Sequence, residues 1–392
     1  MSHPIPEEIL RIVPKEYPAP GFEAPGVRAL FYDGLPWNGK PTRVFAWLGL
    51  PKLAPGERCP AMVLVHGGGG TAFPDWVRLW NARGYAAIAM DTCGGVPGWH
   101  ETPWSRKPWP RHPHSGPAGW GLDVESFAPE LPLDAQWPYH ATAAVVLGHS
   151  LLRAVPGVDA SRIGLTGVSW GGYLTCLAAG VDPRFAFAAP VFGCGFLGHA
   201  SSTLGWQVKA EQSRERLEKW LELWDPSRYL PAADMPFLWV NGTNDFAFPM
   251  SSLQKSYRLT KGRRDLAIRV RMPHGHGGAG EKPPEILAMA ESLFRGGAPL
   301  PTFTGQGAAG GEVWAEVASP RPLERAEFNF TRASGHWMDR TWNTVPVEVE
   351  KATGRMRAAL PPDTTAWYFN VFAEGDLVAS SEHGERGADE SA

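Results

Sequence analysis

Apolar and polar positions follow two different patterns along the chain, and the first covers roughly residues 60–296. Short apolar runs, each the length of one buried strand, alternate there with stretches whose apolar residues recur at helical spacing. The strand-like runs are CPAMVLV, YAAIAMD, RIGLTG, RFAFAAPVFG, PFLWVNG and LAIRVRM, and the helix-like stretches include FPDWVRLWNARG and PYHATAAVVLGHSLLRAVPG. This alternation predicts a mostly parallel sheet with helices on both faces, in which ligands bind at the carboxyl ends of the strands.

The second pattern has a period of two and begins after residue 300. The segments EVWAEVA, RAEFNFT, WMDRTWN, VPVEVE, RMRAALP, AWYFNVFA and LVASSE are predicted to be short strands separated by turns. We therefore expect a small all-β sandwich over residues 302–383, after an α/β domain over 28–298 that opens with two antiparallel strands, VRALFYDG and TRVFAWLGLP. Residues 1–27 are predicted to form a surface arm, and residues 384–392 a mobile tail.

Two segments interrupt the first pattern, at residues 92–138 and 193–228. The first is rich in proline, and the second contains a helix predicted over about 207–224. Loops of this length in a compact domain are usually functional or disordered. We expect both inserts to form the walls of a substrate pocket at the carboxyl edge of the sheet.

Tryptophan is unusually frequent, with 18 in 392 residues, and five fall in or beside the first insert: Trp99, Trp104, Trp109, Trp120 and Trp137. Tryptophan can present a ring to sugars or aromatic groups, or can simply bury a large area. We take Trp99, Trp104 and Trp120 as candidate pocket residues, together with His66 from outside the insert. The alternative is that the tryptophans only pack the insert onto the domain.

Composition narrows the class of protein. The formal net charge is −3, so the chain lacks the excess of basic residues expected of a nucleic-acid-binding protein. No apolar run is long enough for a membrane helix. The N-terminal MSHPIPEEIL lacks the basic and apolar regions of a secretion signal, so the default expectation is cytoplasmic, or secreted if a signal has been removed. Four scattered cysteines do not form a zinc motif, and we expect no metal or organic cofactor. Homo-oligomerisation is left open.

The candidate chemistry centres on Ser169, in the sequence Gly-Val-Ser-Trp-Gly over residues 167–171. This GxSxG motif lies between the predicted strand RIGLTG and a helix that begins GGYLTCLAAG, which is the setting of a nucleophile elbow. The small residues on either side allow a sharp turn that lifts the hydroxyl above the sheet. The motif alone could also be an ordinary glycine-lined turn with an incidental serine. The neighbouring motifs are therefore needed to distinguish a nucleophile from a turn residue.

A serine nucleophile needs a base and a carboxylate, which here follow it in the order acid, then histidine. Asp245 follows the strand PFLWVNG, whereas Asp225 precedes it and is the weaker candidate for the acid. Two histidines follow the strand LAIRVRM in PHGHGG. We favour His276 as the base, because the sequence Pro-x-x-His-Gly at the end of the last core strand matches the usual loop, and keep His274 as the second choice.

Backbone donors for an oxyanion are expected at two places. One is the amide of Trp170, which follows the nucleophile, and the other is the loop HGGGG over residues 66–70, with Gly68 and Gly69 as candidates. Glycines there let backbone N–H groups approach a substrate oxygen. A nucleotide-binding interpretation is weaker, because no GK[ST] sequence follows the glycines.

The motifs VLVHGGGG, GVSWGGY, NGTNDFAFP and MPHGHGG, in this order, resemble those of the α/β-hydrolase superfamily. They are similar in particular to the branch of acetyl xylan esterases and prolyl-oligopeptidase-type serine peptidases. The resemblance implies an α/β-hydrolase fold followed by the small β-sandwich, and a serine carboxylic-ester hydrolase acting on a small-molecule ester, such as an acetylated, aryl or sugar ester. A serine peptidase is the alternative, although the propeller that usually precedes the hydrolase domain in those peptidases has no counterpart here. A non-catalytic protein that binds carbohydrate through Trp337, Trp342 and Trp367 is the third candidate.

Overall fold

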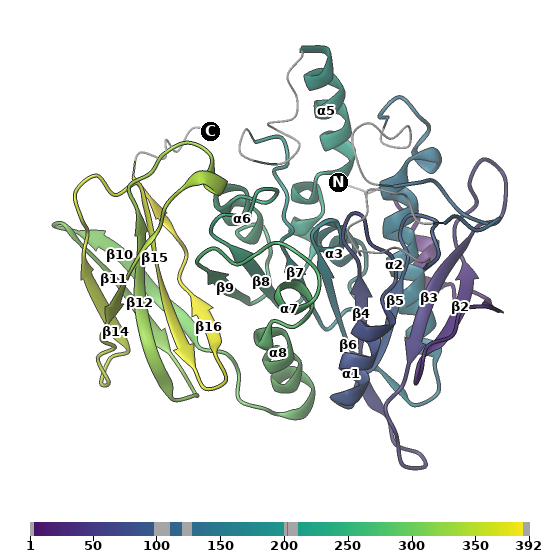
Figure 1. Cartoon of the computed structure of the whole chain (residues 1–392), viewed down its shortest axis with the longest axis horizontal. Helices are drawn as coiled ribbons and strands as arrows, with labels where there is room; N and C mark the ends of the chain where they lie inside the picture. The colour runs from purple at the N-terminus through teal and green to yellow at the C-terminus, as the bar shows by residue number, and fades with distance from the viewer. Residues whose placement is uncertain (1–3, 98–109, 120–127, 200–201, 203–210, 387–392) are drawn as a thin grey trace.

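The computed structural model describes residues 4–97, 110–119, 128–199, 202 and 211–386. An α/β domain takes up the N-terminal three quarters of the chain, and an all-β unit packs beside it at the C-terminal end (Figure 1). The expected layout, an α/β domain followed by a β-rich unit, is confirmed.

The α/β domain is built on a nine-stranded sheet with the order β1-β2-β3-β5-β4-β6-β7-β8-β9. Its strands are β1 (Glu16–Pro18), β2 (Arg28–Asp33), β3 (Arg43–Gly49), β4 (Cys59–Val65), β5 (Ala86–Met90), β6 (Val158–Val168), β7 (Phe187–Val191), β8 (Phe237–Gly242) and β9 (Arg264–Arg269). The strands from β5 to β9 along this order pair in parallel, whereas β1, β2 and β3 are antiparallel. Part of the predicted N-terminal arm is therefore an edge strand.

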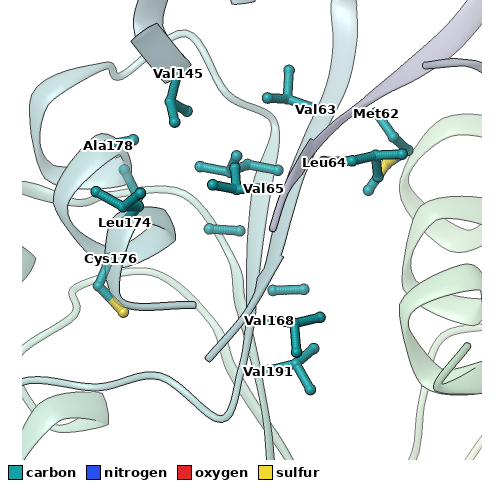
Figure 2. Close-up of a cluster of buried hydrophobic side chains, with 14 of the residues drawn as sticks. Met62, Val63, Leu64, Val65, Val145, Val168, Leu174, Cys176, Ala178 and Val191 are labelled. Atoms are coloured by element: carbon teal, nitrogen blue, oxygen red, sulfur yellow. The ribbon is translucent and has the colours of Figure 1, made fainter. Parts of the chain in front are cut away.

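Helices cover both faces of this sheet, which explains why every residue of β4 is buried. Helices α1 (Pro74–Ala82) and α8 (Pro284–Arg295) lie on one face, and α2 (Trp137–Ala154) and α3 (Trp170–Val181) on the other. Successive residues of a strand point to opposite faces. Accordingly, Val63 and Val65 point toward α2 and α3, whereas Met62 and Leu64 point to the other side (Figure 2).

The two inserts are described in part. Residues 98–109 and 120–127 of the first, and residues 200–201 and 203–210 of the second, lie outside the described residues. Trp137 forms the start of α2, where its Nε1 donates to the Thr92 carbonyl at 2.7 Å. In the second insert, α5 (Glu211–Trp224) corresponds to the helix predicted over about 207–224.

The C-terminal unit contains two antiparallel sheets, one of β10 (Thr302–Ala309), β11 (Glu312–Ala318) and β14 (Arg355–Ala359). The other contains β12 (Leu323–Thr331), β13 (Asn343–Val347), β15 (Ala366–Ala373), β16 (Leu377–Ser380) and β17 (Gly384–Glu385). Strand β17 pairs with β15, so pairing continues past the boundary predicted at residue 383. Residues 387–392 of the predicted tail lie outside the described residues.

One predicted strand, WMDRTWN, is wrong. Its first residues form a 3-10 turn, Trp337–Asp339, whose carbonyl groups face the α/β domain instead of a neighbouring strand. The side-chain amide of Asn244 donates to the carbonyl groups of Trp337, Met338 and Arg340 at 3.3, 3.0 and 2.6 Å. The alternating pattern does not reveal this contact, because the partner is distant in the sequence.

The C-terminal unit also packs against β9, the edge strand of the large sheet, and provides hydrogen-bond partners for the backbone of Ile268. In β9, the Ile268 amide donates to Ser380 Oγ at 2.8 Å, and the Ile268 carbonyl accepts from Asn370 Nδ2 at 3.0 Å. An uncovered edge strand invites pairing with other chains, and side chains that cap its polar groups prevent this. The sandwich therefore covers this edge of the α/β domain at Ile268.

Candidate active site

Ser169 occupies a strained turn between β6 and α3. Its backbone has φ 59° and ψ −119°, a region that is costly for a residue with a side chain and is common at functional sites. The turn demands glycine on both sides. A Cβ at Gly171 would lie 2.0 Å from the Val65 carbonyl oxygen, and one at Gly167 would lie 2.2 Å from that of Gly171. The two glycines of the GxSxG motif are therefore required for the tight turn that exposes the Ser169 hydroxyl.

His274 connects Ser169 to Asp245. Its Nε2 lies 2.8 Å from Ser169 Oγ, and its Nδ1 lies 2.6 Å from Asp245 Oδ2. A carboxylate only accepts hydrogen bonds, so the Nδ1–H donates to Asp245 and the lone pair of Nε2 faces the serine hydroxyl. Such a chain of contacts can move the serine proton onto the imidazole and stabilise the resulting cation.

Asp245 is held rigidly for this contact. The side chain is 2% exposed, and its other oxygen, Oδ1, accepts from the amides of Ala247 and Phe248 at 2.9 and 2.7 Å. Asp225, the weaker candidate for the acid, has a different role. Its carboxylate accepts from the amides of Ser227, Phe196 and Leu197 and so caps a 3-10 turn.

The preference for His276 as the residue facing Ser169 is corrected by this geometry. His276 Nε2 accepts from the Gly67 amide at 2.8 Å, and its Nδ1 lies 3.0 Å from Glu281 Oε1. The physical reason lies in the preceding turn. Strand β9 ends at Arg269, and Arg271 has φ 53°, so the chain reverses earlier than the predicted strand LAIRVRM allows. The histidine that reaches the serine is then His274, the second choice.

The glycine loop after β4 lies next to the serine turn. The Gly67 carbonyl accepts from the Gly70 amide at 3.2 Å and lies 2.8 Å from His66 Nδ1. Gly68 and Gly69 form the tip of this loop, and Gly69 has φ 73°. Trp170, the other predicted source of an amide donor, is the first residue of α3, directly after Ser169.

His66 braces this loop from the inside, and does not line a pocket as expected. It is 2% exposed, and its Nε2 accepts from the Thr92 amide at 3.0 Å. The Nδ1–H must then donate to the Gly67 carbonyl. Burial lowers the pKa of His66, although nearby Asp91 opposes this, and the neutral ring fits both contacts.

Aromatic side chains surround His274. Phe192 stacks on its ring with a centroid distance of 4.7 Å, and Phe246 packs against it at 4.7 Å with 43% of its own surface exposed. Sequence reasoning missed both residues, although Phe246 directly follows Asp245. The other pocket candidates, Trp99, Trp104 and Trp120, lie outside the described residues. Of the sandwich tryptophans, Trp337 is buried, and Trp342 and Trp367 are half-buried.

Within the described ranges, no group of three or more His, Cys, Asp or Glu side chains is arranged to hold a metal ion. None of the described helices combines the length and apolar character that a membrane crossing needs. All four cysteines are free thiols.

A model of the prolyl oligopeptidase family matches residues 133–292. Among solved structures, the chain is similar to an acetyl xylan esterase from Paenibacillus sp. R4, with 20% identity, TM-score 0.54, and coverage of 75% of this chain and 97% of that one. Acetyl xylan esterase 1 from Thermoanaerobacterium sp. JW/SL YS485 gives 17% identity, TM-score 0.54 and coverage of 75% and 96%. Pyrococcus horikoshii acylaminoacyl peptidase gives 20% identity and TM-score 0.50, but only 43% of its length is covered, by 69% of this chain. No curated protein matches the sequence.

The structural likeness, at these identities, defines the fold, which is that of the α/β-hydrolases. The family match and the fold together support a serine hydrolase of the branch that contains acetyl xylan esterases and prolyl-oligopeptidase-type peptidases.

Proposed function

We propose that the chain is a serine esterase, with Ser169 as nucleophile, His274 as general base and Asp245 as the carboxylate that orients the base. The contact of His274 with both partners, at 2.8 and 2.6 Å, carries this proposal. Both distances lie within hydrogen-bond reach, as required between a nucleophile and its base and between the base and the group that orients it.

The reaction proceeds in two steps. As Ser169 Oγ attacks the ester carbonyl carbon, its proton moves to His274 Nε2, and Asp245 stabilises the imidazolium. The tetrahedral oxyanion accepts hydrogen bonds from the amide of Trp170 and from Gly68 or Gly69 in the glycine loop. His274 then gives its proton to the departing alcohol, which leaves an acyl ester on Ser169.

Water completes the cycle. His274 removes a proton from a water molecule that attacks the acyl carbonyl, a second oxyanion forms at the same amides, and the C–O bond to Ser169 breaks. The proton returns to Ser169 Oγ, and the carboxylic acid is released. The reaction consumes one water molecule per ester.

An ester substrate is favoured by the extent of the structural likeness. The two acetyl xylan esterases correspond to this chain over 97% and 96% of their length, whereas the acylaminoacyl peptidase corresponds over 43%. The family match over residues 133–292 favours a peptidase as the second candidate. Comparing kcat/KM for p-nitrophenyl acetate with that for acyl-peptide p-nitroanilides tests this choice. Faster cleavage of the anilides would reverse it.

The exposed ring of Phe246 beside His274 supports a ring-bearing ester as substrate. An aromatic surface next to the nucleophile can stack on an aryl or sugar ring of the alcohol group. Phe246→Ala should raise KM for aryl and glycosyl acetates more than for ethyl acetate. Leu293→Ala, which removes a similarly exposed side chain from α8, is the control. Equal effects of Phe246→Ala on all three esters would exclude this preference.

A further inference from the structure

The ring of His276 lies between the glycine loop and Glu281, the last residue of α7 (Gly278–Glu281). Because the Gly67 N–H donates to Nε2 at 2.8 Å, this nitrogen carries no proton, so Nδ1–H donates to Glu281 Oε1 at 3.0 Å. Glu281 therefore selects the tautomer that can accept from Gly67. The rings of Phe73 and Trp76 pack against His276, with centroid distances of 4.9 and 5.9 Å, and fix its position.

The contact with His276 restrains one of two peptide planes that meet at Gly67. The Gly67 N–H belongs to the peptide between residues 66 and 67, which His276 holds. The Gly67 carbonyl belongs to the next peptide, which His66 and Gly70 hold. With both planes held, both backbone dihedrals of Gly67 are restrained.

The second of these planes also contains the Gly68 N–H, a candidate oxyanion donor. No peptide bond among the described residues is cis, so the N–H and C=O of this plane point in opposite directions. The carbonyl points toward His66, and the Gly68 N–H therefore points away from it. A flip of either plane would redirect an N–H and bring a carbonyl oxygen into its place.

Gly67 needs such external support because no side chain is tolerated there. A Cβ at this position would lie 2.7 Å from the Val168 carbonyl oxygen and 3.0 Å from Ser169 Cβ. Glycine removes this clash but leaves the backbone free to adopt many conformations. Contacts from other parts of the chain must then select the productive one.

We propose that His276, held in one tautomer by Glu281, is a positioning residue that sets the direction of the amide donors in the loop of residues 67–70. This inference rests on the proposed serine esterase function. It assigns the two histidines of the PHGHGG sequence different tasks: His274 moves the proton, and His276 fixes the backbone that binds the oxyanion.

The test compares variants of the full chain in p-nitrophenyl acetate hydrolysis and in inhibition by phenylboronic acid, which forms a tetrahedral adduct with an active serine. Loss of one oxyanion donor costs about 100- to 1,000-fold in kcat, so a misdirected donor in His276→Ala should cost about 10- to 100-fold, with KM unchanged. The inhibition constant for the boronic acid should rise by a similar factor. His276→Gln should restore most of the kcat and most of the boronic acid affinity, because the amide oxygen of glutamine can accept a hydrogen bond from the Gly67 amide.

Two further variants separate positioning from general stability. Glu281→Ala leaves the His276 tautomer unselected and should give an intermediate loss of kcat. His149→Ala removes a buried histidine paired with Asp182 at 2.8 Å. Asp182 follows α3, a helix of 12 residues that begins next to Ser169, so this pair lies about 18 Å from the nucleophile. This control should lower the melting temperature without changing kcat.

Wild-type kcat and boronic acid inhibition that persist in His276→Ala would overturn the positioning role alone. A failure of His276→Gln to recover activity, together with a loss as large as that of His274→Ala, would overturn the positioning role and also the choice of His274 as the base, since His276 would then be the base. A wild-type chain that neither hydrolyses esters nor reacts through Ser169 would overturn the proposed function itself, and the inference with it.

Discussion

The side-chain amide of Asn244 donates a hydrogen bond to the carbonyl oxygen of Arg340 at 2.6 Å and so joins the acid loop to the C-terminal sandwich. Asn244 directly precedes Asp245, and the same amide reaches the carbonyl groups of Trp337 and Met338. The sandwich thus contacts the α/β domain one residue away from the proposed acid. This contact gives the sandwich a part in the site, in addition to covering β9.

We expect Asn244→Ala to lower both stability and activity. The carbonyl groups of residues 337–340 would lose a shared partner, which should cost about 1–3 kcal/mol of unfolding free energy. Freed from the sandwich, the acid loop should also hold Asp245 less well and reduce kcat. Thermal unfolding and ester kinetics measure the two effects.

Gln254→Ala is the matched control for this variant. Gln254 Nε2 also donates across the domain junction, to the His383 carbonyl at 2.7 Å, but it lies on α6 (Met250–Tyr257) away from the acid loop. Its loss should lower stability without lowering kcat. A similar fall in kcat for both variants would show that the junction as a whole matters, and not the contact next to Asp245.

Asp245→Asn should reduce kcat about 10⁴-fold with little change in folding, as expected when the base is left in the wrong tautomer. The amide of asparagine can donate to His274 Nδ1, which would place the ring proton on Nε2, facing Ser169. Asp225→Asn, in the competing acid, should lower the melting temperature but retain turnover. Comparable activity of Asp245→Asn and the wild type at neutral pH would remove Asp245 from the mechanism.

His112 should make the fold sensitive to acid. Burial lowers the pKa of His112 from 6.5 to about 4, and neither ring nitrogen has a hydrogen-bond partner among the described residues. The unfolded chain therefore binds more protons than the folded chain between these values. The stability due to the neutral ring is complete above pH 6.5 and is lost as the pH falls toward 4.

His112→Phe should reduce this sensitivity, since phenylalanine cannot take up a proton and can still pack against Phe31, whose ring centroid is 4.8 Å from that of His112. Melting temperatures measured from pH 7 to pH 4 should fall less steeply for the variant than for the wild type. His336→Gln, at an exposed position, should leave the slope unchanged. Equal slopes of melting temperature against pH for His112→Phe and the wild type would contradict the claim that His112 causes the acid sensitivity.

The four cysteines should be unreactive in the folded chain. Burial raises the pKa of each thiol, at Cys59, Cys93, Cys176 and Cys194, so the reactive thiolate is scarce at pH 8. Iodoacetamide should modify none of them rapidly under native conditions and all four after denaturation. Rapid native modification of Cys93, which is only half-buried, would show that its segment opens to solvent.

The sequence predicts the parts of the fold and site that depend on local pattern. The run before Ser169 is short and mostly apolar, and the longer run after it is helix-like, so the strand, turn and helix of the elbow are all visible. Asp245 is recognisable for the same reason, because it closely follows an apolar strand. The preference for His276 does not match the contact that Ser169 makes with His274, because which histidine reaches the serine depends on where β9 ends, and the positive φ of Arg271 is not visible in the pattern.

Other features depend on contacts between distant segments. The sequence around Trp337 alternates apolar and polar residues as a strand does. Its contacts with Asn244 explain why it forms a turn instead of a strand. Strand β1 has three residues, too few to show a period. Helix α6 spaces its buried apolar residues Met250, Leu253 and Tyr257 as a helix does, so its pattern was visible in the sequence but was not used. The role of His66 inside the glycine loop likewise depends on the Thr92 amide.

The most direct test of the central claim is the reaction of the folded chain with a fluorophosphonate probe, followed by peptide mapping. If Ser169 is the activated nucleophile, one equivalent of probe should attach to Ser169, ester hydrolysis should stop in proportion, and Ser169→Ala should neither react nor hydrolyse esters while keeping its melting temperature. Labelling at another residue, or ester hydrolysis retained by Ser169→Ala, would contradict the account.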